Sequence, residues 1–121
     1  MDELIKRLET NIGLDRAVSE KAIGIILNFL LKEGPADKVQ ALIAQLPGAE
    51  AALNAAEGNG GGATFGMGGI MAVGSQLMAA GLSMGQVQSV TREVIAYARE
   101  KLGEDAVGQI VGAVPGLSQF V

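Results

Sequence analysis

Apolar residues recur every three or four positions in several stretches of the chain, which is the spacing of one face of an α-helix. The first stretch covers residues 2–12, and Gly13 ends it. The second begins after Asp15, a residue type that caps helices, and continues to Gly34-Pro35. Its apolar face is unusually wide. This width is typical of a central helix that other helices nearly enclose.

A third helix and a short segment complete the first half of the chain. The helix is predicted from Ala36, with Val39 and Leu42 facing inward, and Pro47-Gly48 ends it. The alanine-rich residues 49–57 are predicted to form a short turn or helix.

Residues 58–69 read GNGGGATFGMGG, with seven glycines in twelve positions. Glycine loses more backbone entropy on folding than any other residue, so we predict a linker here. A glycine run before a helix can also bind phosphate through backbone N–H groups. That alternative is disfavoured because no lysine or arginine lies between Glu57 and Arg92, and no strand is predicted before the run.

Three more helices are predicted after the linker. The first covers residues 70–80 and ends at Gly81. Ser83 and Gln86 have the spacing of a capping box, in which each side chain accepts a hydrogen bond from the other residue's backbone. The second of the three helices starts there, and a third is predicted to follow Gly103.

The two halves of the chain align without a gap when residues 13–53 are shifted by 68 positions. Many apolar positions coincide. Six pairs are identical: Gly13/Gly81, Leu14/Leu82, Asp37/Asp105, Val39/Val107, Pro47/Pro115 and Gly48/Gly116. Caps and breakers recur in unrelated helical proteins, which is the alternative explanation. We predict an internal duplication.

The predicted fold is therefore all-α, a helical bundle of two tandem three-helix repeats joined by a Gly-rich linker. The first repeat covers residues 1–57, the linker residues 58–69 and the second repeat residues 70–121. A unit of about 55 residues is marginally stable alone. We therefore expect the two repeats to share one core in a single globular unit.

Composition disfavours several classes of function. The chain has no histidine and no cysteine, which removes the commonest general base, thiol chemistry and the usual zinc ligands. We expect no enzyme, no metal and no cofactor, and the acidic residues at predicted helix starts are assigned to helix stabilisation. The formal net charge is −4 and the basic residues are scattered, so we expect no nucleic-acid partner.

The uncharged span 58–91 is long enough to cross a bilayer. Glycine, serine, glutamine and asparagine interrupt it, and neither flank carries a basic cluster, so the composition argues against a membrane span. The charged N-terminus does not have the pattern of a signal peptide, and the expected location is the cytoplasm.

Four of the five methionines lie in or after the linker: Met67, Met71, Met78 and Met84. Methionine fills irregular gaps and adapts to different partners. These side chains are a candidate apolar groove between the repeats, with ordinary core packing as the alternative.

With these features in view, the chain resembles small bacterial helical proteins of unknown function, labelled VcgC/VcgE-like. The resemblance rests on Gly13-Leu14, the ILNFL stretch at 26–30, QLPGAEAAL at 45–53, the glycine-rich middle and Gly81-Leu82. It implies an all-helical fold. It carries no known activity and no catalytic residue.

Mean hydropathy is +0.34, which is high for a chain too small to enclose much apolar surface. We therefore expect a non-catalytic interaction or scaffold protein that self-associates as a homodimer or binds another protein. Two alternatives stay open: a carrier or sensor of a small, lipid-like apolar ligand held between the repeats, and a membrane-associated protein.

Overall fold

The computed structural model describes residues 2–46, 48 and 70–113. Six α-helices occupy this part of the chain, which contains no strand: α1 (Asp2–Asn11), α2 (Arg16–Glu33), α3 (Ala36–Ala44), α5 (Ile70–Ala79), α6 (Met84–Leu102) and α7 (Glu104–Ala113). The all-helical prediction is confirmed here. The segment 49–57, the linker 58–69 and three residues of the repeat signature lie outside the described residues: Pro47, Pro115 and Gly116.

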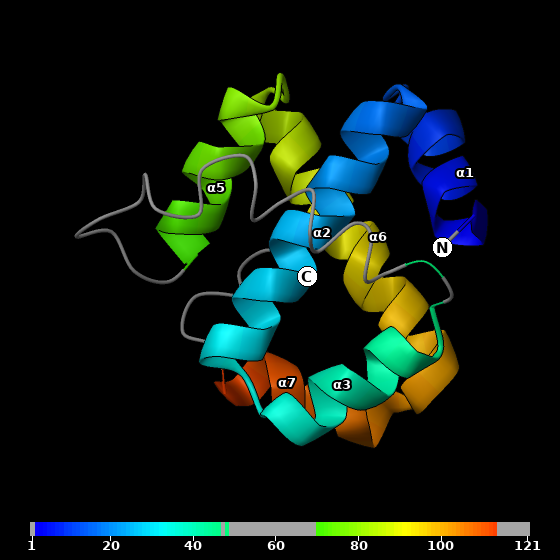
Figure 1. The fold of residues 1–121 in the computed structure, drawn as a ribbon, viewed down its shortest axis with the longest axis vertical. Coiled ribbons are helices and arrows are strands. Elements are labelled where there is room, and N and C mark those ends of the chain that lie inside the picture. The colour runs from blue at the N-terminus through cyan, green and yellow to red at the C-terminus, as the bar shows by residue number, and fades with distance from the viewer. Residues whose placement is uncertain (1, 47, 49–69, 114–121) are drawn as a thin grey trace.

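The two longest helices, α2 and α6, lie next to each other at the centre of the bundle (Figure 1). Helices α1 and α5 lie toward one end, and α3 and α7 contact each other at the opposite end. Helix α1 packs on α2 and also on α6, whereas α5 packs on α6 and also on α2. The first helix of each half therefore contacts the central helix of the other half.

Buried apolar side chains from both halves form one continuous cluster. As the sequence predicts for a central helix, α2 buries side chains around most of its circumference, including Ile23, Ile26 and Leu27. Val39 and Leu42 on α3 are buried, and their counterparts 68 positions later, Val107 and Ile110 on α7, are buried too.

The helix boundaries themselves follow the 68-residue spacing. Helices α1, α2 and α3 begin at residues 2, 16 and 36, and α5, α6 and α7 begin at residues 70, 84 and 104. Each start in the second half therefore lies 68 positions after its counterpart, and the ends agree to within one residue. The caps and breakers of the two halves thus delimit helices of nearly the same lengths.

The glycines predicted to end the first helix of each half are both left-handed, with φ of +84° at Gly13 and +110° at Gly81. Beyond α5, the N–H of Leu82 donates to the carbonyl of Leu77 (3.1 Å), and the N–H of Gly81 donates to the carbonyl of Met78 (3.0 Å). This pair of bonds is a Schellman motif, and the accompanying side chains of Leu77 and Leu82 are both buried.

The two predicted caps of the central helices differ. At Ser83 the capping box is confirmed, because Ser83 Oγ accepts from the Gln86 N–H and Gln86 Oε1 accepts from the Ser83 N–H. Asp15 occupies the N-cap position of α2 with extended backbone angles, but its side chain makes no capping hydrogen bond. The residue three positions after Asp15 is Val18, which has no acceptor to complete a reciprocal pair.

Among the described residues, the buried hydroxyl of Ser19 lacks a hydrogen-bond partner. Ser19 on α2 is fully buried and its hydroxyl makes no hydrogen bond, whereas Val87 occupies the corresponding position on α6. Thr91, also buried, donates its hydroxyl to the Val87 carbonyl (2.9 Å). A buried hydroxyl without a partner costs about 1–3 kcal/mol, and nothing in the structure explains its presence at Ser19.

Candidate functional site

The last turns of α5, the loop that follows and the first turns of α6 form a surface that we call the α5–α6 corner, residues 75–88. Its backbone is fixed by the left-handed Gly81 and by the capping box at Ser83. Its inner side is anchored by Leu77 and Leu82, which are 0% and 4% exposed. The corner therefore presents its outward side chains from a well-defined turn between two helices.

Two methionines lie on the outside of this corner. Met78 in α5 is 48% exposed, and Met84, the first residue of α6, is 62% exposed. They are the large hydrophobic side chains that stand out to solvent in the part of the chain that the structure describes. Exposed side chains of this kind are enriched where one protein contacts another.

The rest of the corner surface carries no charge. Its other exposed residues are small or neutral: Ser75, Ala79, Gly81, Ser83, Gly85 and Gln88. In the sequence, no ionisable side chain occurs between Glu57 and Arg92. A surface without charge loses little hydration free energy when another uncharged surface covers it.

The corresponding turn between α1 and α2 has a different surface. Subtracting 68 from Met78, Met84 and Ser83 gives Thr10, Arg16 and Asp15, and all three of these residues are exposed. Gln88 corresponds to Glu20, which is half-buried. The two turns share their backbone design, but only the α5–α6 corner combines exposed methionines with the absence of charge.

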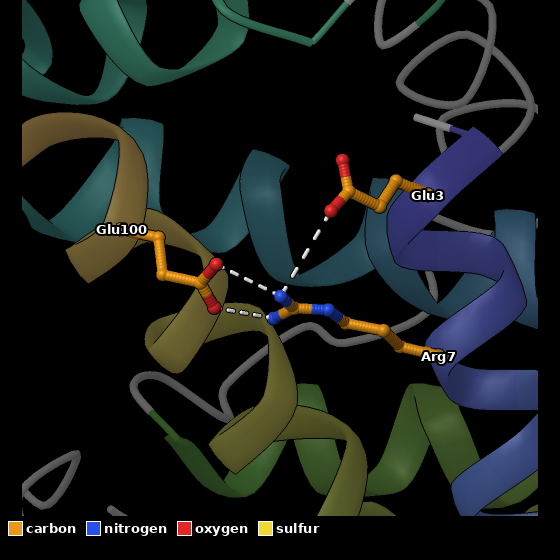
Figure 2. Close-up of polar contacts among 3 residues, drawn as sticks. All are labelled: Glu3, Arg7 and Glu100. Atoms are coloured by element: carbon orange, nitrogen blue, oxygen red, sulfur yellow. Dashed lines mark hydrogen bonds and ion pairs between the residues drawn. The ribbon is translucent and has the colours of Figure 1, made fainter.

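Helix α1 carries an ion-pair cluster that joins the two halves, shown in Figure 2. Arg7 reaches from α1 to Glu100 on α6, with Nη1 at 2.6 Å from Oε2 and Nη2 donating to Oε1 at 2.8 Å. Glu3, one turn earlier on α1, lies 4.0 Å from the same guanidinium. Arg7 and Lys101 also lie over the ring of Tyr97, at 5.3 and 5.2 Å from its centroid.

The hydrogen bond from Arg7 lowers the pKa of Glu100 and raises the pKa of Arg7. A carboxyl group with a lowered pKa in the folded state stabilises the protein above its unfolded pKa, and this stability is lost as the pH falls through the folded value. We therefore expect Glu100→Gln to lower the melting temperature at about pH 7 and to have almost no effect near pH 2.

The measurement is thermal unfolding of the wild type and Glu100→Gln at a series of pH values. Glu9→Gln, on α1, serves as the control for loss of one acidic side chain, because Glu9 is not among the carboxylates that raise the pKa of Arg7. A difference between wild type and Glu100→Gln that persists unchanged at about pH 2 would contradict the ion-pair assignment.

Of the four methionines of the candidate groove, the structure describes the side chains of two. Met78 and Met84 lie at the surface on either side of Gly81. Met67 lies outside the described residues, as does the side chain of Met71. The groove between the repeats stays a prediction. The sequence marked Met78 and Met84 as candidate binding residues, although it did not establish that they are exposed.

Within the described ranges, no group of three or more acidic side chains is arranged to hold a metal ion. Asp37, Glu104 and Asp105 lie in the first turns of α3 and α7, as predicted for acids that favour helix starts. Among the helices that the structure describes, none is both long enough and apolar enough to span a bilayer.

The Arg7–Glu100 contact could not be predicted from the sequence, because the two residues lie 93 positions apart. The available signal was weak: Arg7 lies on the polar side of an amphipathic helix, which does not identify a partner.

Comparison of the chain with protein-family models, curated proteins and solved structures found no match.

Proposed function

We propose that this chain is a non-catalytic self-association module. Its two tandem three-helix repeats form one bundle, and the α5–α6 corner of one copy packs against the same corner of a second copy. The observation that carries the proposal is the pair of exposed methionines, Met78 and Met84, on a surface without charge.

The 68-residue spacing of the helix starts supports the duplication. The packing is consistent with it, because α1 on α6 and α5 on α2 are equivalent contacts if the halves are exchanged. Two copies of one unit begin with the same surfaces. The methionines and the missing charges of the α5–α6 corner are then differences between the second copy and the first.

The lack of charge on the α5–α6 corner favours a second copy of this chain as the molecule that covers it. In a two-fold symmetric contact the same patch meets itself, so a charged patch places like charges together. The α1–α2 turn contains Asp15 and Arg16, whereas the α5–α6 corner contains no ionisable side chain. With a net charge of −4 on each copy, the corner is a surface where two copies can meet without desolvating or opposing charges.

The free energy gained by covering the methionines can be compared with the free-energy cost of association. Full burial of a methionine contributes about 1.5–3 kcal/mol, so covering the exposed parts of four methionines contributes roughly 3–7 kcal/mol per dimer. Association costs about 4–15 kcal/mol in lost freedom of motion. The methionines alone therefore do not offset this cost. With the rest of the α5–α6 corner also covered, we expect a weak dimer, with a dissociation constant of about 0.1–1 mM.

Sedimentation equilibrium over a concentration series that reaches the millimolar range tests this proposal. The wild type should show a concentration-dependent mass between those of monomer and dimer. The double variant Met78→Lys/Met84→Lys should stay monomeric, because two lysines per copy would face two lysines of the other copy.

The control variant is Thr10→Lys/Ala17→Lys, which adds the same charge at exposed positions of the α1–α2 turn. It should dimerise like the wild type. A wild type that is monomeric throughout contradicts self-association, and equal loss of dimer in the two double variants contradicts the assignment to the α5–α6 corner.

A further inference from the structure

We infer that Met78 and Met84 form an oxidation-sensitive switch, in which conversion of their thioethers to sulfoxides by a peroxide separates the two copies. This inference rests on the proposed self-association through the α5–α6 corner. It adds a chemical modification and a means of regulation to that surface.

The chemistry needs an accessible sulfur and a peroxide. The thioether sulfur attacks one peroxide oxygen, an S–O bond forms and the O–O bond breaks. The sulfur loses two electrons, and hydrogen peroxide is reduced to water. In the free copy Met78 and Met84 are 48% and 62% exposed, so a small oxidant reaches both side chains without any opening of the fold.

Among the side chains that the structure describes, few others compete for the oxidant. The sequence contains no cysteine, whose thiolate reacts with peroxide in many redox sensors. The single tyrosine, Tyr97, is 3% exposed and lies under the cations of Arg7 and Lys101. Among the described side chains, the exposed thioethers are therefore the first site of oxidation.

Oxidation at these positions changes the surface and leaves the core intact. The buried residues of the described ranges include leucine, isoleucine, valine and aromatic side chains but no methionine. Sulfoxide formation elsewhere in proteins often disrupts a core. Here it adds a polar S=O group to the outside of α5 and to the start of α6, where the fold does not depend on it.

The added group acts on the contact between copies. A sulfoxide oxygen is a strong hydrogen-bond acceptor, and covering it removes its bonds to water, which among the exposed residues of this corner only Ser75, Ser83 and Gln88 have side-chain donors to replace. Two copies that meet through the corner would bury four such groups. We expect the dissociation constant of the dimer to rise by at least about tenfold.

The experiment treats the full chain with hydrogen peroxide, follows each methionine by peptide mass spectrometry, and measures association by sedimentation equilibrium. Met78 and Met84 should oxidise at rates within about threefold of that of N-acetylmethionine amide. The oxidised protein should become monomeric while its far-UV circular dichroism stays unchanged. Methionine sulfoxide reductases A and B together should restore the dimer.

The matched control is Met78→Leu/Met84→Leu, which keeps the apolar surface but cannot accept oxygen. Its dissociation constant is measured first without peroxide, and peroxide treatment should leave that value unchanged. If it loses its dimer as the wild type does, oxidation acts at another methionine and the inference is wrong. Slow oxidation of Met78 and Met84, or an oxidised wild type that still dimerises, also overturns it.

These outcomes are distinct from failure of the proposed function. An unoxidised wild type that stays monomeric contradicts self-association itself, and the switch fails with it. An unoxidised dimer that peroxide does not affect contradicts the switch alone.

Discussion

Replacement of Leu77 by alanine is expected to lower the free energy of unfolding by about 2–5 kcal/mol. Leu77 is fully buried in α5, and its backbone carbonyl accepts the hydrogen bond from Leu82 that closes the turn. The substitution leaves a cavity where α5 meets the central helices α2 and α6. Because natural domains are stable by only about 5–15 kcal/mol, this single change removes a large part of the total.

Urea unfolding monitored by circular dichroism measures the effect, with Ser75→Ala as the control. Ser75 lies on the same helix and is exposed, so its replacement should change stability by less than about 0.5 kcal/mol. If the two variants have the same unfolding midpoint, Leu77 does not belong to a packed core. The slope of the unfolding free energy against urea concentration depends on the surface exposed on unfolding. If the two variants have equal slopes, their midpoints can be compared directly.

Replacement of Gly81 by alanine is expected to cost about 1–3 kcal/mol. The backbone at Gly81 has φ of +110°, a conformation that side-chain-bearing residues rarely adopt, although no atom would obstruct a Cβ there. The cost therefore comes from backbone strain and not from crowding. The two Schellman hydrogen bonds, from Leu82 to Leu77 and from Gly81 to Met78, should weaken as the turn relaxes.

Gly108→Ala is the matched control, and its expected effect on the free energy of unfolding has the opposite sign. Gly108 lies inside α7, is exposed, and has open space around the position of a Cβ. Alanine there should stabilise the protein by about 0.5–1 kcal/mol, because it favours the helix more than glycine does. The same urea experiment measures both variants. A Gly81→Ala protein as stable as Gly108→Ala would contradict the role of the left-handed turn.

The positions of the helices could be predicted because the signals that end and begin them are local. Gly13 and Gly81 end helices in left-handed conformations, and Ser83 with Gln86 starts one through a reciprocal pair of bonds. Asp15 shows the limit of such signals. Its residue type suits a cap, but its side chain makes no capping hydrogen bond, and Val18, three positions later, has no acceptor for the backbone N–H of Asp15.

The packing of the helices could not be predicted in the same way. An amphipathic pattern shows which face of a helix is buried but not which helix covers it. Nothing in the sequence of α1 indicates that Arg7 meets Glu100, and the same periodicity would suit a bundle in which each half packed alone. Ser19 is another case, since its polar side chain lies at a fully buried position where Val87 is the counterpart.

The candidate site was predictable in part. The lack of charge between Glu57 and Arg92 is a property of the sequence, and so is the clustering of four methionines at residues 67–84. Whether Met78 and Met84 line a groove, fill a core or face solvent depends on their angular positions relative to helices far away in the chain. Methionine is compatible with each of these environments, so its identity alone does not decide between them.

The contacts of α1 with α6 and of α5 with α2 also bear on the kinetics of folding. Residues from opposite ends of the described chain meet, with 93 positions between Arg7 and Glu100. Helical bundles fold fast when neighbours in sequence are neighbours in space, and a high mean sequence separation of contacts slows folding. During synthesis α1 has to wait until α6 leaves the ribosome, which takes roughly 5–20 s at about 5–20 residues per second. During that interval its apolar face, with Leu4 and Leu8, lacks one of the two helices that cover it in the native fold.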